Sequence, residues 1–185
     1  EKLILAEGLA PKVLGGEFTV LDRFKGKTLE HKQYKPFFPY FEGKYDKIYY
    51  VTLADFVTLD DGTGIVHMAP AFGADDMAVG QANDLPVVMP VNEEARFTAE
   101  VGPWAGQFVK EADPKIIEDL RQRGLLFASG KITHTYPFCW RCDTPLLYYA
   151  RPSWFIRTSA VKDRMVALNQ EINWLPDHIK NGRFG

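Results

Sequence analysis

The chain has few cysteines, no long apolar run and no excess of one charge. Only two of its 185 residues are cysteine, too few for the disulfide framework of a small secreted domain. No run of apolar residues approaches the roughly 20 that a membrane-spanning helix needs, so we expect no membrane partner and a cytoplasmic location. Its 22 basic residues are balanced by 24 acidic ones, so binding to a nucleic acid would depend on local basic patches and not on net charge.

The sequence also lacks internal repeats, low-complexity segments and a secretory signal. Its 185 residues, 46% of them hydrophobic, are enough for one sizeable domain and an appendage. The chain begins with Glu1 and not with Met, and the sequence before Gly185 has no feature typical of a protein C-terminus. We therefore expect it to be a segment of a longer protein.

Short runs of β-branched and aromatic residues alternate with turn signals in the first part of the chain. These runs, at 18–24, 47–52, 56–59 and 86–91, favour a barrel-like β-core. Helices are expected at 7–14, 74–83, 114–123 and 159–169, the third with Asp113 as N-cap and Pro114 at its first position. The predicted fold class is therefore α+β. A change of composition near Ser129 predicts a first domain at 1–128 and a connector at 129–185.

The most distinctive stretch, residues 62–76, reads GTGIVHMAPAFGADD. A tight turn leads into a short apolar strand that ends at His67. A kinked loop follows and ends at Asp75 and Asp76, where a helix begins. The helix dipole and free N–H groups favour a carboxylate in the first turn as the anion, which suits it to hold an ammonium group. The alternative is that both acids are helix caps and that the histidine is an ordinary surface or core residue.

This stretch resembles the editing-pocket motif of class I aminoacyl-tRNA synthetases for branched aliphatic amino acids. Pro-Ala-Phe-Gly at 70–73 stands where the valyl and leucyl members carry Pro-Ala-His-Asp, and it is similar to the isoleucyl members. Cys-Trp-Arg-Cys at 139–142 and Ser-Trp-Phe-Ile at 153–156 follow in the order found in these enzymes. The resemblance implies an editing insertion with a barrel-like β-core, followed by a return connector that carries half a zinc ribbon.

In these enzymes the editing site hydrolyses the ester between valine and the 3′ end of tRNA(Ile) with a positioned water and without a cofactor. The resemblance implies that Asp76 holds the α-amino group of the valine. It also implies that His67 shapes the pocket so that valine enters and isoleucine does not. The parent enzyme would attach isoleucine to tRNA(Ile) with ATP, and its remaining domains would be the other partners of this segment.

Four further residues are expected to line the same pocket. Thr63 and Gly64 are small, which lets a backbone approach the ligand closely. Phe72 and Gly73 are expected against the terminal adenosine or the amino-acid side chain. Asp75 is the alternative to Asp76 as the residue that binds the ammonium group. We expect Asp75 instead to point to solvent and to cap the helix.

The chain departs from the family pattern in two respects. The threonine-rich strand that forms the second wall of the pocket, Trp-Thr-Thr-x-Pro-Trp-Thr, is absent, and the family order places it upstream of Glu1. The signatures of the synthetic site, of the His-x-Gly-His and Lys-Met-Ser-Lys-Ser types, are also absent. We therefore expect no ATP-dependent aminoacylation from this segment and an incomplete editing site in isolation.

Cys139 and Cys142 have the Cys-x-x-Cys spacing of half a tetrahedral zinc site, with His134 as a further candidate ligand. In some isoleucyl enzymes the matching pair lies upstream, so we expect no zinc ligated wholly by this chain, although the parent enzyme could hold one. A chance pair or a redox pair is the alternative. The same cysteines, with scattered basic residues, support a different hypothesis: a non-catalytic RNA-binding module or a structural connector, which leaves residues 62–76 unexplained.

Overall fold

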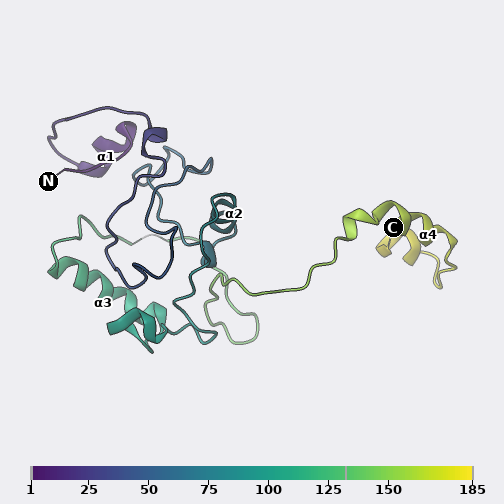
Figure 1. Cartoon of the computed structure of the whole chain (residues 1–185). Coiled ribbons are helices and arrows are strands. Elements are labelled where there is room, and N and C mark those ends of the chain that lie inside the picture. The colour runs from purple at the N-terminus through teal and green to yellow at the C-terminus, as the bar shows by residue number, and fades with distance from the viewer. Residues whose placement is uncertain (1, 132, 185) are drawn as a thin grey trace. The chain divides into compact units, whose positions relative to one another are not determined.

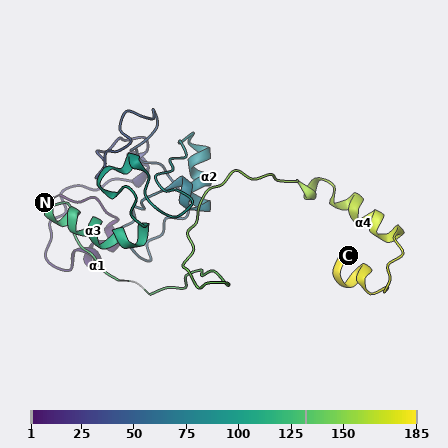
Figure 2. The same cartoon turned by 90° about the horizontal axis from the view of Figure 1, so that it is seen from below.

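The chain forms two compact units. The computed structural model describes residues 2–131 and 133–184, and it divides into units at Glu1–Ala150 and Arg151–Gly185 (Figures 1 and 2). The boundary expected at 128/129 falls inside the first unit. As a domain boundary of a longer protein it stays a prediction.

Short helices joined by long irregular segments make up both units (Figure 1). The helices of the first unit are η1 (Glu7–Leu9), α1 (Ala10–Leu14), η2 (Gly26–Leu29), η3 (Pro70–Phe72), α2 (Ala74–Ala82), η4 (Ala99–Trp104) and α3 (Val109–Gln122). Those of the second unit are η5 (Thr158–Ala160), α4 (Lys162–Glu171) and the π-helical η6 (Lys180–Phe184).

The start of α3 differs from the prediction. The helix begins five residues earlier than expected, with Phe108 and not Asp113 at the N-cap, so Pro114 lies inside it. A proline within a helix removes one backbone hydrogen bond. The additional turn buries Ala112 completely, and this packing offsets that loss. The other end follows the prediction, because Gly124 takes a left-handed φ of 67° immediately after the helix.

Extended segments of the described chain pair only at isolated antiparallel bridges. These bridges are Gln33↔Tyr50, Val91↔Phe97, Arg96↔Phe108 and Phe138↔Pro145. A turn follows residue 91, since Asn92 N–H donates to Arg96 O at 2.8 Å. The barrel-like β-core stays a prediction.

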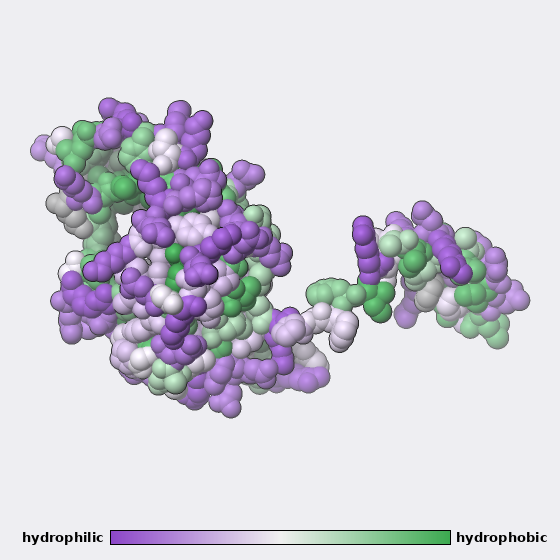
Figure 3. Space-filling model, viewed as in Figure 1, coloured by the Kyte–Doolittle hydropathy of each residue, from purple (hydrophilic) through white to green (hydrophobic). Residues whose placement is uncertain are grey.

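Buried apolar residues of the first unit are small in number and come from several elements. They are Leu9, Ala10, Ala71, Val91, Val101, Trp104 and Ala112. Hydrophilic residues cover much of the visible face of this unit, with hydrophobic atoms between them (Figure 3). Among the described residues, no helix is both long enough and apolar enough to cross a membrane. Since Ala71 is only 3% exposed, the loop that carries it is part of the core and not a surface appendage.

Candidate functional site

The loop at residues 69–73 and the first turn of α2 form one compact structure around Asp76. Its Oδ2 accepts a hydrogen bond of 2.9 Å from the Ala69 N–H, and the side chain is half-buried. Asp75, its neighbour in the same turn, is exposed. The carboxylate of Asp76 therefore turns back over the loop, whereas that of Asp75 meets solvent.

Two glycines allow this loop and α2 to pack closely. Gly73 is the N-cap of α2, and a Cβ at this position would lie 3.0 Å from Asp76 Cγ. Gly80 is buried in α2, and a Cβ there would lie 3.0 Å from Pro70 Cγ. A side chain at either position would have to displace a neighbour, so both glycines are required by the packing of the loop on the helix.

Residues 149–150, for which no site role was expected from the sequence, also contact the loop. The rings of Phe72 and Tyr149 meet edge to face, with centroids 6.2 Å apart and planes at 74°. The Ala150 N–H donates to Ala71 O at 2.8 Å. The Tyr149 hydroxyl donates to Val91 O at 3.0 Å. Residues 146–150 have the apolar and aromatic composition of a strand, which does not identify a packing partner.

The turn that contains Thr63 and Gly64 packs against the N-terminal segment. Thr63 O accepts a 2.8 Å hydrogen bond from Ala6 N–H. Gly64 has a left-handed φ of 75°, and a Cβ on it would lie 2.5 Å from Ala6 Cβ. The close approach that these small residues permit is therefore made here by the chain's own backbone, and an approach to a ligand stays a prediction.

An ion pair ties the same turn to α1. Lys12 Nζ donates to Asp61 Oδ1 at 2.8 Å. This hydrogen bond, followed by one from the Gly62 N–H, lowers the pKa of the Asp61 carboxyl below its ordinary value. Both side chains are largely exposed, so the pair adds little to stability.

His67 lies in an exposed stretch. Its side chain is exposed, as are those of Ile65 and Val66 before it. Within the described part of the chain, no hydrogen bond or ring contact joins His67 to Asp76. The structure thus brings Asp76 and Gly73 together beside Phe72, and it shows no bond that ties His67 to them.

Cys139 and Cys142 lie in a tight turn closed by its own backbone. Cys139 N–H donates to Thr144 O, and Cys139 O accepts from Asp143 N–H, both at 2.9 Å. Asp143 takes a φ of 52° at the corner. Both cysteines are free thiols, and Cys142 is exposed. We call residues 138–145 the cysteine turn.

Hydrogen bonds within the cysteine turn favour the thiolate of Cys142. Its Sγ lies 3.1 Å from Thr144 Oγ1. The hydrogen bonds from the Thr144 side chain and backbone, and then one from the Cys139 thiol, lower the pKa of Cys142 below its ordinary value.

The donor set of the cysteine turn matches half of a tetrahedral zinc site. In residues 2–131 and 133–184 there is no group of three or more His, Cys, Asp or Glu side chains placed to hold a metal ion. His134, the other candidate ligand, has its Nδ1 2.9 Å from Thr135 O and its ring against Tyr136. Among the described residues, the structure thus places no third candidate ligand beside the two thiols.

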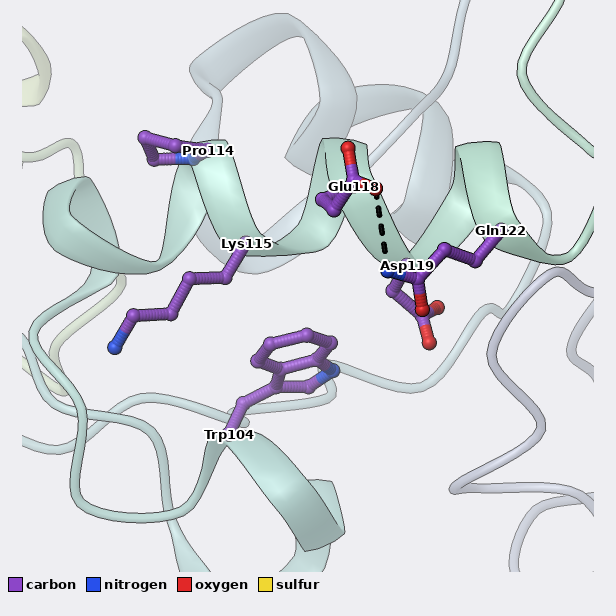
Figure 4. Close-up of a pocket in the computed structure, with 6 residues that line it drawn as sticks. All are labelled: Trp104, Pro114, Lys115, Glu118, Asp119 and Gln122. Carbon is purple, nitrogen blue, oxygen red and sulfur yellow. Dashed lines mark hydrogen bonds between the residues drawn. The ribbon is translucent and has the colours of Figure 1, made fainter.

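A surface pocket of about 440 Å³ lies between η4 and α3, away from residues 62–76 (Figure 4). The pocket is lined by Trp104, Pro114, Lys115, Glu118, Asp119 and Gln122. The indole of Trp104 lies opposite side chains of α3 (Figure 4), on which Gln122 Nε2 donates to Glu118 Oε1 at 3.1 Å. No pattern in the sequence indicates this pocket, because Trp104 meets the lining residues of α3 only when α3 packs on η4.

Proteins similar to this chain define its class. No protein-family profile matches, but individual relatives do, and they are aminoacyl-tRNA ligases. The chain is homologous to a segment of isoleucine–tRNA ligase, as the resemblance predicted. It is 52% identical over 185 residues to that ligase of Clostridium novyi and 49% identical over 185 residues to that of Thermus thermophilus. The Streptomyces coelicolor ligase is 49% identical over 186 residues.

Each of these matches covers 100% of the chain but only 17–18% of the relative. The chain thus corresponds to less than a fifth of the length of these ligases. Their names state ligation of isoleucine to tRNA and do not state editing.

Proposed function

We propose that this chain is the editing domain of an isoleucyl-tRNA synthetase and that it hydrolyses valine wrongly attached to tRNA(Ile). The observation that carries the proposal is the half-buried Asp76 carboxylate, fixed over the loop by the 2.9 Å bond from Ala69 N–H. The parent enzyme attaches isoleucine to tRNA(Ile) with ATP, in the cytoplasm and through its remaining domains. Homology over the whole chain to isoleucine–tRNA ligases supports this assignment.

Asp76 has the chemistry to hold the α-ammonium group of the misattached amino acid. A carboxylate accepts hydrogen bonds at both oxygens. Oδ2 is used by the loop, so Oδ1 is the atom we assign to the ammonium. A charge-assisted bond of this kind is about twice as strong as a neutral one. Because Asp76 lies in the first turn of α2, the bound ammonium group fixes where the ester carbonyl lies.

Hydrolysis at this site requires positioning more than a protein nucleophile. A water molecule held at the ester carbonyl is sufficient when its geometry is fixed, because orientation alone contributes several kcal/mol. Editing is needed because a hydrophobic pocket distinguishes one methylene by only about 1–3 kcal/mol, a value measured on isoleucyl enzymes among others. We assign His67 to the wall that excludes isoleucine, and Thr63, Gly64, Phe72 and Gly73 to the substrate-binding surface.

No cofactor is assigned to this reaction. A zinc ion in the parent enzyme would have a structural role, with Cys139 and Cys142 supplying two of its ligands. The isolated chain is expected to hydrolyse its substrate slowly, because the threonine-rich wall of the family is absent from this sequence.

The test measures whether binding depends on the substrate ammonium. The protein is a complete isoleucine–tRNA ligase, such as the Thermus thermophilus enzyme, in which this chain replaces the homologous segment. We call it the chimeric ligase. The ligands are a non-hydrolysable valine–adenosine conjugate and its analogue without the amino group. A charge-assisted hydrogen bond contributes about 1.5–3 kcal/mol, so the unmodified chimera should bind the amino ligand at least tenfold more tightly.

Asp76→Asn and Asp75→Asn are the matched pair of variants. Asp76→Asn should bind the two ligands equally, whereas Asp75→Asn should keep the preference. An unmodified chimera without preference for the amino ligand would contradict the proposal. RNA binding without any dependence on the amino acid would instead support a non-catalytic RNA-binding module.

A further inference from the structure

We call residues 69–73 the Asp76 loop, and it contacts both α2 and residues 149–150. At α2, Asp76 accepts the bond from Ala69 N–H, and Pro70 packs against Gly80. At residues 149–150, Ala150 N–H donates to Ala71 O, and the ring of Tyr149 meets that of Phe72. The loop is therefore held by two segments that are far apart in the sequence.

The loop has little local structure to maintain its own conformation. Its 3-10 turn, η3, spans three residues, and Phe72 N–H donates to Ala69 O at 2.8 Å. A turn this short depends on its packing, because a single hydrogen bond contributes little net stability. The ring contact of Tyr149 is one of the contacts outside the loop that fix it.

Tyr149 is itself held in place at its far end. Its hydroxyl donates to Val91 O at 3.0 Å, and Val91 is only 6% exposed. The buried residue Val91 therefore fixes the hydroxyl end of the Tyr149 ring, and the ring packs against that of Phe72. Its sequence neighbour Tyr148 is 69% exposed and offers a control of the same residue type.

We propose that Tyr149 is a positioning residue for the editing site: by fixing Phe72 and η3, it sets the position of the Asp76 carboxylate relative to the substrate. The proposal rests on the proposed editing function. Tyr149 acts through the loop and need not touch the substrate. A displacement of about 1 Å in a catalytic site can lower the rate about 100-fold, so a loosened loop should lower kcat more than it changes KM.

The test combines two measurements on the chimeric ligase. Hydrogen exchange of the peptide at residues 69–76 reports local opening of the loop without reference to activity. Hydrolysis of valyl-tRNA(Ile) gives kcat and KM. The variants are Tyr149→Ala, Tyr149→Phe and the control Tyr148→Ala, and isoleucine activation and the melting temperature are measured for each.

Tyr149→Ala should increase exchange of the loop and lower kcat for valyl-tRNA(Ile) about tenfold or more, with isoleucine activation unchanged. Tyr149→Phe keeps the ring on Phe72 but loses the hydrogen bond to Val91 O, so its exchange and kcat should lie between those of Tyr149→Ala and of the unmodified chimera. Tyr148→Ala should change neither measurement. If Tyr149→Ala fails to fold, Tyr149→Leu keeps apolar volume without the flat ring and should show the same increase in exchange and fall in kcat.

The possible outcomes separate this inference from the proposed function. Unchanged exchange of the loop and unchanged kcat in the folded variants would overturn the positioning role. Increased exchange with an unchanged kcat would also overturn it, because the loop would then be held without being needed for the reaction. If the unmodified chimera does not hydrolyse valyl-tRNA(Ile), the editing function fails, and increased exchange in Tyr149→Ala would still support fixation of the loop.

Discussion

The Asp76 loop and the cysteine turn are both short motifs, but they are held in different ways. The Asp76 loop is fixed by long-range contacts, since Gly80 packs on Pro70 and Tyr149 packs on Phe72. The cysteine turn is closed by bonds between its own residues, such as the 2.9 Å bond from Cys139 N–H to Thr144 O. Ala71 in the loop is buried, whereas Cys142 in the turn is exposed.

This difference indicates what each motif can do without other parts of a protein. A loop fixed by two segments places its carboxylate accurately, as a binding site for a small molecule requires. An exposed turn with two thiols can present ligands, but it does not complete a metal site by itself. Changes near the Asp76 loop should therefore alter stability and selectivity, and changes in the cysteine turn should alter only thiol chemistry.

The largest effect on stability is expected at Gly64. Gly64→Ala places a side chain at a φ of 75° and 2.5 Å from Ala6 Cβ. The left-handed conformation costs about 1–2 kcal/mol, and the overlap adds about 1–3 kcal/mol. Gly62→Ala is the control, because Gly62 has a similar φ of 72° and a Cβ added there would have no atom within 4 Å. Its free energy of unfolding should fall only by the cost of the left-handed conformation. Urea unfolding measures both, and equal losses would show that the contact with Ala6 is unimportant.

A smaller effect, on selectivity, is expected at His67. In the chimeric ligase, His67→Ala should enlarge the pocket so that correctly charged isoleucyl-tRNA(Ile) is also hydrolysed, about tenfold faster than before. The reason is that the excluded methylene is worth about 1–3 kcal/mol in such a pocket. Val66→Ala is the control, because Val66 is also exposed. This variant should leave isoleucyl-tRNA(Ile) intact. If His67→Ala loses all hydrolysis and does not hydrolyse isoleucyl-tRNA(Ile), then His67 is not part of the pocket wall.

The smallest effect is expected in the cysteine turn. Hydrogen bonds from Thr144 lower the pKa of Cys142 below its ordinary 9.0, so its thiolate forms at lower pH than that of an ordinary cysteine. Thr144→Val removes the hydroxyl, which should raise this pKa and move the pH midpoint of alkylation by iodoacetamide upward. Thr144→Ser keeps a hydroxyl and should keep the midpoint low. A midpoint that is the same in all three proteins would show that the hydroxyl does not stabilise the thiolate.

Local signals allowed some elements to be predicted from the sequence. Gly73 with the two acids that follow it indicated a helix at 74–83, and α2 occupies Ala74–Ala82. The helix expected at 7–14 ends at Leu14, where Gly15 caps α1 with a left-handed φ of 63°. These features depend on neighbouring residues and on the dipole of one helix, so a single sequence contains the information.

Features that depend on long-range packing could not be predicted in this way. Nothing near Tyr149 indicates that it meets Phe72, and nothing near Trp104 indicates that it faces α3. The early start of α3 likewise depends on the burial of Ala112, which outweighs the usual position of a proline. The apolar runs at 18–24 and 47–52 were expected to be strands, but β-propensity depends strongly on partners, and the described chain shows only isolated bridges.

The most direct test of the editing proposal compares the two neighbouring aspartates in hydrolysis. The chimeric ligase with Asp76→Ala and with Asp75→Ala is assayed for clearance of valyl-tRNA(Ile), with isoleucine activation as the control. We expect Asp76→Ala to lower clearance about 100-fold, since loss of the ammonium contact misplaces the ester, and Asp75→Ala to stay within about twofold. Clearance at the unmodified rate in Asp76→Ala would contradict the account, and a loss in Asp75→Ala alone would move the ammonium-binding role to that residue.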